Sequence, residues 1–159
     1  MNRERFVELV TAEQEPLRRF LLALCSGDRM EAEEIAQEAL VKAWVASGDY
    51  EERRRFRTWL FRIAYRTFLD HCKRLHTMPL EAAEEVAAPS GLEADSAFCY
   101  EALYAALGRL PEGMRASMLL YHIEGYNIAE IAAITHSNPM AVYQQLHRGM
   151  KRMREILKP

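Results

Sequence analysis

The stretch FRTWLFRIAYRTFLDHCKRL, residues 56–75, decides the fold class of this chain. When it is projected at about 100° per residue, one helix face collects apolar side chains suited to a core: Leu60, Ile63, Ala64, Phe68 and Leu75. With the residue before it, the opposite face collects four cations around one large aromatic side chain: Arg55, Trp59, Arg62, Arg66 and Lys73. The segment therefore predicts an amphipathic helix from about Phe56 to Leu75.

The rest of the chain is predicted to be helical as well. Apolar residues recur at three- and four-residue steps, and no segment alternates with the period of two that a strand needs. Before residue 56, Met30–Val45 carries one apolar stripe, and Phe6–Leu24 predicts a helix interrupted at Pro16. After it, the expected helices are Ser96–Gly108, one from Pro111 to about Glu124, Ile128–Ile134 and Met140–Leu157. The predicted fold class is all-α.

The last two predicted helices form a helix-turn-helix pattern. A short helix is followed by a turn at residues 136–139 and then by a longer basic helix. Asn138 can cap that second helix, with Pro139 at its first position. A short helix, a tight turn and a basic second helix are typical of motifs that place a helix in the DNA major groove.

The charge of the chain divides it into blocks. Residues 79–101 hold six acidic residues, no lysine or arginine, and three proline or glycine residues, whereas both flanking blocks have a small net positive charge. We therefore predict two small helical domains, residues 1–76 and 96–159. Residues 77–95 would join them as an acidic flexible linker.

Several protein classes are disfavoured by the sequence. Its apolar runs are too short for a transmembrane helix of about 20 residues, and the start of the chain lacks the apolar segment of a signal peptide. We therefore expect a cytoplasmic protein without membrane insertion. Three cysteines without a CxxC pair argue against a disulfide framework. His71 and His76, five residues apart, do not share a helix face, so no metal, cofactor or catalytic residue is expected.

Two clusters of basic residues point to a polyanionic partner, one within residues 53–74 and one within residues 148–158. In the first cluster, Trp59 lies among the cations. This combination suits an unpaired DNA strand, because an aromatic ring stacks on a base while cations hold the backbone. The helix by itself equally allows Trp59 to pack at the edge of the core, with the arginines as a solvated face.

Three different motifs follow one another along the chain. They are AEEIAQEALVKAW at residues 32–44, FRTWLFRIA at residues 56–64 followed by Asp70 and Lys73, and Leu110-Pro111 followed by EGY at 124–126 and EIA at 130–132. In sequence and spacing they resemble the motifs of the extracytoplasmic-function sigma factors, members of the sigma-70 family. The resemblance covers nearly the whole chain and implies a region 2-like helical bundle followed by a region 4-like helix-turn-helix.

This resemblance implies an alternative sigma factor that binds core RNA polymerase, recognises −10 and −35 promoter elements and promotes DNA melting. Contact with the clamp coiled coil of the largest polymerase subunit is implied for Glu34, Gln37 and Glu38, which we expect to lack basic partners within the chain. Binding and melting of −10 DNA is implied for Arg55, Trp59, Arg62, Arg66 and Lys73. Binding of −35 DNA is implied for Tyr143, Gln144, His147, Arg148 and Lys151. An anti-sigma factor is a further partner that the resemblance leaves open.

The chain departs from the family pattern in the helix-turn-helix. His136 replaces a usual glycine, which strains the turn if the backbone there has a positive φ. The predicted recognition helix lacks two cations at its front, although Gln144 or Gln145 can pair with adenine. The alternative function is a helix-turn-helix transcriptional regulator, or a sigma-like protein-binding scaffold without initiation activity.

Overall fold

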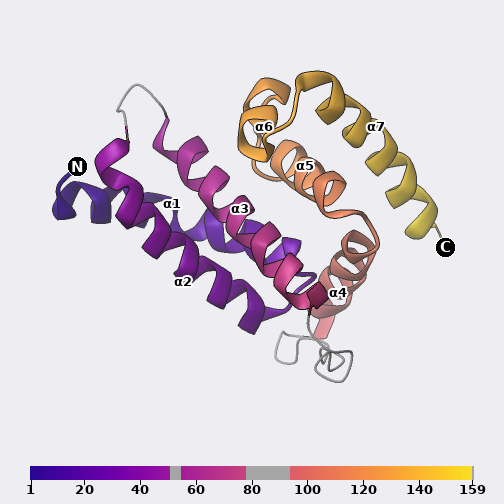
Figure 1. Cartoon of the computed structure of the whole chain (residues 1–159). Helices are drawn as coiled ribbons and strands as arrows, with labels where there is room; N and C mark the ends of the chain where they lie inside the picture. The colour runs from indigo at the N-terminus through magenta and orange to yellow at the C-terminus, as the bar shows by residue number, and fades with distance from the viewer. Residues whose placement is uncertain (51–54, 78–93, 159) are drawn as a thin grey trace.

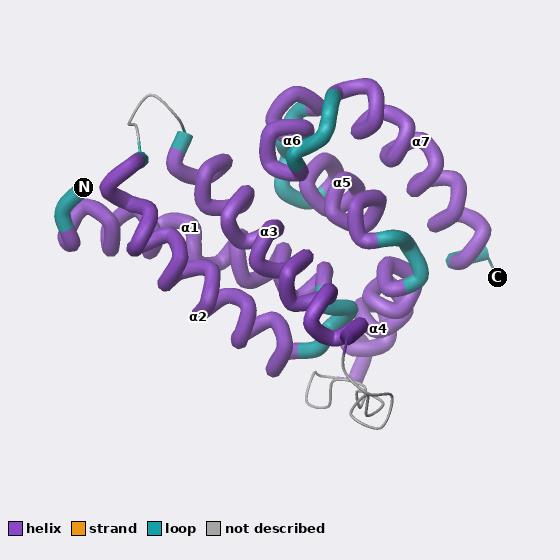
Figure 2. Tube along the Cα trace, in the orientation of Figure 1, coloured by secondary structure: helices purple, strands orange, loops and turns teal. Residues whose placement is uncertain are grey.

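The computed structural model describes residues 1–50, 55–77 and 94–158. Within these ranges the chain is all-α, with no strand, as predicted (Figures 1 and 2). None of the described helices is long and apolar enough to cross a membrane. The elements are α1 (Arg3–Leu24), α2 (Arg29–Ala46), the 3-10 turn η1 (Ser47–Asp49), α3 (Phe56–Thr77), α4 (Ala94–Gly108), α5 (Glu112–His122), α6 (Ile128–Thr135) and α7 (Pro139–Ile156).

Helices α1, α2 and α3 pack on one another and form what we call the first unit. The side of α2 that faces its neighbours is lined by small side chains and one isoleucine: Ala32, Ile35, Ala36, Ala39 and Ala43. The small side chains let α1 and α3 approach closely, and the rings of Phe20 and Phe61 stack 5.3 Å apart in the core between α1 and α3. Asp28 caps α2 by accepting a hydrogen bond from the backbone N–H of Glu31 at 3.2 Å.

Helix α1 continues through Pro16, so the predicted interruption is wrong. Proline has no N–H and removes one helical hydrogen bond. The residues that follow it, Leu17, Phe20 and Leu21, are almost completely buried. Their burial stabilises the helix on the C-terminal side of the proline.

Helices α3 and α4 extend beyond their predicted ends. Thr77 closes α3, and α4 begins at Ala94, so both ends of the predicted linker are helical. The remainder of that linker, including the predicted mobility of its acidic strip, lies outside the described residues.

Helices α4 to α7 form the second unit, which contains the helix-turn-helix of α6 and α7. Asn127 and Glu130 form a capping box at the start of α6. Asn138 accepts a hydrogen bond from the N–H of Ala141 at 2.8 Å, with Pro139 at the first helical position, which confirms the predicted cap. Gly149 lets α7 approach α5, because a Cβ there would lie 2.8 Å from the side chain of Met118.

The turn between α6 and α7 has the strained backbone that the sequence suggested. His136 has φ 59° and ψ 43°, the left-handed conformation in which a side chain is unfavourable. Its N–H still closes the end of α6 by donating to the carbonyl of Ala132. The residue is therefore a non-glycine C-cap.

The two units pack against each other. Helix α3 lies along α6, and α1 contacts α5 and α4 (Figure 1). The buried side chains of both units form one hydrophobic cluster, in which the rings of Phe61 and Tyr126 lie 5.6 Å apart.

Candidate nucleic-acid interface

Trp59 lies at the edge of an aromatic cluster near the start of α3. Its ring centre is 5.0 Å from that of Tyr50 and 5.5 Å from that of Phe56. The side chain is half-buried, and it packs against the core while also lining a cavity. Trp59 therefore packs at the edge of the core and also lines a cavity among the cations, which combines the two arrangements that the sequence allowed.

The five predicted −10 residues lie along one groove between α3 and α6. A cavity of about 590 Å³ is lined by Arg55, Thr58, Trp59 and Arg62 from α3 and its N-terminal flank, and on the other side by Asn127, Ala129, Glu130 and Ala133. A smaller cavity of about 150 Å³ follows along α3, where Arg62, Arg66 and Lys73 contribute to the lining beside Ile134, Thr135 and His136. One wall of the groove is therefore basic and aromatic, and the other belongs to the second unit.

Two of the groove cations already have partners on the second unit. Arg55 forms an ion pair with Glu130 at 3.1 Å, and the Arg62 guanidinium lies 3.0 Å from Nδ1 of His136. Arg66 and Lys73, farther along α3, are exposed. The positive charge of the groove is thus partly compensated at its Trp59 end.

An ion cluster forms around one buried carboxylate, that of Glu124, where α1 and α3 meet the second unit. The side chain of Glu124 is only 1% exposed and accepts two hydrogen bonds from Arg19, each at 2.9 Å. Arg57 donates a third at 3.4 Å and also pairs with Glu13 at 3.2 Å. The hydrogen bond to Glu124 raises the pKa of Arg19. Glu124 belongs to the EGY motif but had no predicted role. The one signal in the sequence was an acidic residue directly after Ile123 in a mostly apolar segment.

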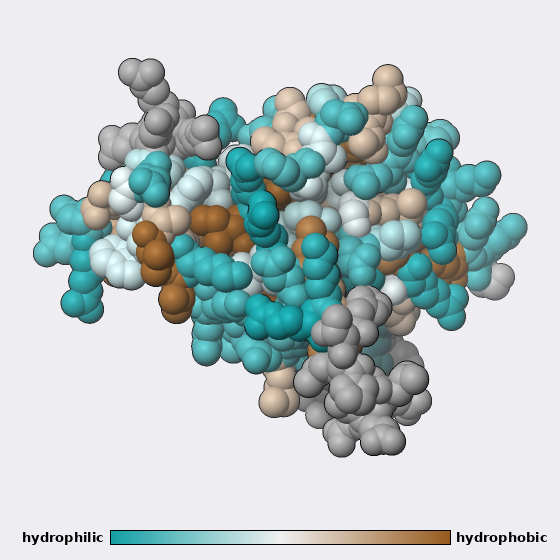
Figure 3. Space-filling view, in the orientation of Figure 1, coloured by the Kyte–Doolittle hydropathy of each residue, from teal (hydrophilic) through white to brown (hydrophobic). Residues whose placement is uncertain are grey.

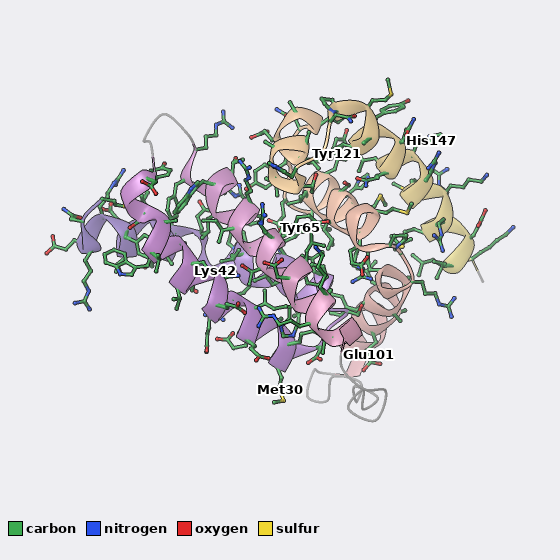
Figure 4. All side chains as sticks on the ribbon, viewed as in Figure 1. Met30, Lys42, Tyr65, Glu101, Tyr121 and His147 are labelled. Carbon is green, nitrogen blue, oxygen red and sulfur yellow. The ribbon has the colours of Figure 1, made fainter. Side chains whose placement is uncertain are left out.

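The five predicted −35 residues share the outer face of α7. Tyr143, Gln144, His147, Arg148 and Lys151 are all exposed, at the spacing of one helix face. In Figure 4, His147 lies on the side of α7 that faces away from the first unit. Gln145 does not share this face, because its amide oxygen accepts a hydrogen bond from the Ser117 hydroxyl at 2.7 Å. Of the two candidate glutamines, Gln144 alone is exposed.

The predicted polymerase-contacting residues lie on the outer side of α2. Glu34 and Gln37 are exposed and line a shallow hollow beside Met30, whose side chain is 85% exposed. Glu38 differs, because it pairs with Arg74 at 2.9 Å and with Lys42 at 3.4 Å. The hydrogen bond from Arg74 lowers the pKa of the Glu38 carboxyl. The expectation that all three lack basic partners is therefore wrong for Glu38, since Arg74 reaches it from α3.

The structure adds an apolar component to this side of α2 that the sequence analysis missed. Val41 and Val45 are 63% and 78% exposed, and Figure 3 shows hydrophobic surface on the α2 side of a largely hydrophilic face. The available signal was two valines one turn apart, outside the buried stripe of Ala39 and Ala43. The outer side of α2 is thus both acidic and apolar, which suits a protein partner.

The described residues provide no group of three or more His, Cys, Asp or Glu side chains that could hold a metal ion. Cys25 is buried and Cys72 is half-buried, and both are free thiols. Burial raises the pKa of Cys72 to about 11. Burial raises the pKa of the Cys25 thiol as well, so both thiols are mainly protonated at neutral pH.

Comparison with known proteins places both units in one family. Residues 9–77 match the model of sigma-70 region 2, and residues 100–153 match that of sigma-70 region 4. The ECF RNA polymerase sigma factor SigW of Bacillus subtilis is 27% identical over 83% of this chain and 78% of its own length. SigE of Mycolicibacterium smegmatis is 32% identical over 83% of this chain, which spans 54% of that relative.

Solved structures show the same fold over nearly the whole chain. The sigma factor RpoE in its complex with the anti-sigma factor NepR, from Bartonella quintana, matches with a TM-score of 0.86 over 98% of both chains at 21% identity. CnrH, in complex with the cytosolic domain of CnrY, matches with a TM-score of 0.76 over 98% of this chain and 89% of that one, at 22% identity. Sigma factors are regulatory proteins rather than enzymes. The chain belongs to the extracytoplasmic-function group of the sigma-70 family, the alternative RNA polymerase sigma factors that act in transcription initiation.

Proposed function

We propose that this chain binds core RNA polymerase through α2, holds the −10 element as a single strand on α3, and reads the −35 duplex with α7. The observation that carries the proposal is the presence of two separate sets of candidate DNA-binding residues, one on α3 and one on α7. Five basic or aromatic residues of α3 and its N-terminal flank line one groove, and five polar or basic residues of α7 share one exposed face.

On α3, Trp59 supplies what DNA melting requires. A melted strand loses base stacking, and a base stacked on an aromatic side chain regains about 1–3 kcal/mol. Arg55 and Arg62 flank Trp59 in the same cavity and can hold the phosphates on either side of a stacked base. Arg66 and Lys73 continue the basic path along the helix.

On α7, the exposed face suits duplex DNA. Tyr143 and Gln144 lie in the first turns of the helix, the part of a recognition helix that contacts base edges. Arg148 and Lys151 follow one and two turns later and suit phosphate contacts. Because Gln145 is held by Ser117, adenine reading is proposed for Gln144 alone.

On α2, Glu34 and Gln37 are proposed to contact the clamp coiled coil of the largest polymerase subunit, with Glu38 beside them. The exposed Val41 adds apolar area to that contact. The proposed location, the cytoplasm, follows from this partner. An anti-sigma factor is a further proposed partner, since RpoE and CnrH, whose folds match this chain, were solved with NepR and CnrY.

The test is transcription reconstituted from core polymerase, this chain and a library of genomic fragments. We expect transcripts that require the chain and whose start sites share sequence elements at −10 and −35. The Trp59→Ala variant is assayed in parallel. It should lose most of these transcripts, because it lacks the side chain proposed to stack on a base. Duplex binding without any chain-dependent transcript would contradict the proposal and favour a helix-turn-helix regulator.

A further inference from the structure

Helix α7 packs on α5 through contacts that are largely apolar and adaptable (Figure 1). A Cβ at Gly149 of α7 would lie 2.8 Å from Met118 and 3.1 Å from Met114, both on α5. Methionine side chains are unbranched and flexible, so they fill irregular gaps and tolerate more than one packing arrangement. Apolar contacts of this kind hold α7 on α5, but they are not directional and do not fix the rotation of α7 about its own axis.

One polar contact lies in the same helix–helix surface. The hydroxyl of Ser117, on α5, donates to the amide oxygen of Gln145, on α7, at 2.7 Å. Ser117 is fully buried, and Gln145 is half-buried. Gln145 precedes Gly149 by one turn of α7, and Ser117 follows Met114 by three residues of α5, so the hydrogen bond lies beside the methionine contacts. Unlike those contacts, a hydrogen bond is directional.

Gly113 makes room for the Gln145 side chain. A Cβ at Gly113 would lie 2.9 Å from the amide nitrogen of Gln145, which is closer than an ordinary contact. Gly113 is in the first turn of α5, where alanine would favour the helix more than glycine does. The Gln145 amide is therefore held from two sides: Ser117 binds its oxygen, and Gly113 leaves space for its nitrogen.

The rotation of α7 decides where Gln144 points. Successive residues are about 100° apart around a helix, so Gln144 turns together with Gln145. Side-chain ends lie about 5–6 Å from the helix axis, and a rotation of about 10° therefore moves them by about 1 Å. Hydrogen-bond distances to a base edge vary by only about 0.5 Å. A rotation small enough to leave α7 packed on α5 would thus lose a base contact.

We propose that Gln145 is a positioning residue for −35 recognition: its hydrogen bond to Ser117 fixes the rotation of α7 on α5 and so directs Gln144 to its base. This inference rests on the proposed reading of the −35 duplex by Gln144. One glutamine faces inward and orients the helix, and its neighbour is exposed and contacts the base. Arg148 and Lys151 depend less on the rotation, because long flexible side chains follow a phosphate over a wider range.

The test measures sequence discrimination separately from duplex binding and from stability. The wild-type full chain first selects duplexes from a library with a randomised segment of about 10 base pairs, one turn of DNA. Fluorescence anisotropy then gives the affinity for the selected duplex and for its single-base variants, over a range of salt concentrations. Calorimetry gives the Tm of each protein.

Four variants of the full chain are compared with the wild type. Ser117→Ala removes the donor, Gln145→Met removes the acceptor at nearly constant size, and Gly113→Ala displaces the amide. The fourth variant combines Ser117→Ala with Gln145→Met. Ser47→Ala is the matched control, because Ser47 is also a buried serine, and its hydroxyl donates to the Trp44 carbonyl in the first unit at 2.6 Å.

A glutamine paired with adenine discriminates against the other bases by about 5- to 150-fold. In Ser117→Ala, Gln145→Met and Gly113→Ala, this ratio should fall towards one at the adenine position. Binding of mismatched duplex and its salt dependence should keep their wild-type values, because the phosphate contacts remain. Ser47→Ala should keep the wild-type ratio.

The double variant separates positioning from packing. Removing one partner leaves a polar group without its hydrogen bond and should lower Tm, whereas removing both replaces the pair by apolar groups and should restore most of the lost Tm. The discrimination ratio should stay low in the double variant, since the directional contact is still missing. A ratio that recovers together with Tm would overturn the inference and make the pair a packing contact.

Gln144→Ala distinguishes failure of this inference from failure of the proposed function. It should reduce the ratio at the same base position as Ser117→Ala does. If Gln144→Ala reduces the ratio and Ser117→Ala does not, positioning is overturned while base reading by Gln144 stands. If Gln144→Ala keeps the wild-type ratio, or the wild type selects no sequence, the proposed function of Gln144 fails and its positioning fails with it. Selection of an additional adenine by Ser117→Ala would make Gln145 itself a base-reading residue, which also overturns the inference.

Discussion

Helices α3 and α7 both present basic residues, but the rest of the chain packs around these two faces differently. At the aromatic end of the stripe on α3, Arg55 and Arg62 contact Glu130 and His136 of the second unit, and the Arg55 side chain remains 81% exposed. The face of α7 is exposed along its length. The two helices therefore differ in how the folded chain packs around their basic faces rather than in charge alone.

The difference follows from the chemistry of the two faces. A face that holds an unpaired strand needs an aromatic surface, and Trp59 beside Phe56 and Tyr50 provides one. Apolar surface favours burial, so another part of the chain can cover it. The face of α7 is polar and basic apart from Tyr143, which makes covering it unfavourable. The aromatic face of α3 is thus easier to pack against within the chain than the polar face of α7.

The largest predicted effect concerns Trp59 on α3 and the opening of promoter DNA. Trp59→Ala removes a base stack of about 1–3 kcal/mol, so opening of a linear promoter should slow by roughly 5- to 150-fold while duplex binding survives. Permanganate reactivity of unpaired thymines measures the opening. Trp44→Ala, which changes the other tryptophan, 44% exposed on α2, is the matched control and should open the promoter normally.

A promoter with a pre-melted −10 bubble distinguishes a loss of base stacking from a loss of folding in the Trp59→Ala variant. The Trp59→Ala variant should recover much of its activity there, because the template no longer requires opening. Opening of the linear template at the wild-type rate would instead make Trp59 a packing residue of the aromatic cluster.

The second prediction concerns α2, which should act independently of either DNA-binding helix. Replacing Glu34 and Gln37 by lysine should weaken binding to core polymerase about tenfold, since rim charges of the wrong sign oppose association. Thermal stability should change by less than about 0.5 kcal/mol because both side chains are exposed. Affinity is measured by titration of labelled chain with core enzyme.

Glu38 is the wrong residue for this test, although the sequence suggested it. Reversing its charge would also break its pairs with Arg74 and Lys42. Unchanged binding of the Glu34 and Gln37 variant to core enzyme would move the polymerase contact away from this side of α2.

Helix positions and faces were largely readable from the sequence. Apolar spacing gave the helices to within a few residues, and Asn138 with Pro139 marked the start of α7 because capping is a local interaction. Pro16 misled the prediction. The local cost of proline is visible in a sequence, whereas the burial of Phe20 and Leu21 that outweighs it depends on the packed fold.

The contacts between the units could not be predicted in the same way. Arg19 and Glu124 are separated by 105 residues, and nothing near either one indicates the other. The groove between α3 and α6 depends on the same long-range packing. The sequence therefore supplied the candidate residues, while the structure showed which of them are already partnered.

The third prediction concerns Arg148 on the exposed face of α7. Arg148→Ala should weaken duplex promoter binding several-fold and reduce the salt dependence by about one phosphate contact. Arg109→Ala, an exposed cation on the loop between α4 and α5, makes the same change in net charge away from α7 and is the control. Equal salt dependence of the two variants would show that the effect is net charge rather than a contact made by α7.

The smallest predicted effect concerns the turn that joins α6 to α7. His136 and Ser26 are the two non-glycine residues with a positive φ among those described, one in each unit. A side chain in the left-handed conformation costs about 1–2 kcal/mol, which glycine avoids, although glycine also increases the entropy of the unfolded chain. His136→Gly should therefore stabilise the chain by about 0.5–1 kcal/mol, which raises Tm by a few degrees for a chain of this length.

The His136 substitution also separates backbone strain from domain contact. The imidazole is exposed, and it lies 3.0 Å from the Arg62 guanidinium across the groove. If strain dominates, His136→Gly and Ser26→Gly should both raise the Tm measured by calorimetry. If the Arg62 contact dominates, His136→Gly should lower Tm, whereas Ser26→Gly should still raise it. We expect strain to dominate, because one exposed hydrogen bond contributes less than the backbone cost. A fall in Tm on His136→Gly would make this histidine part of the contact that holds α6 on α3.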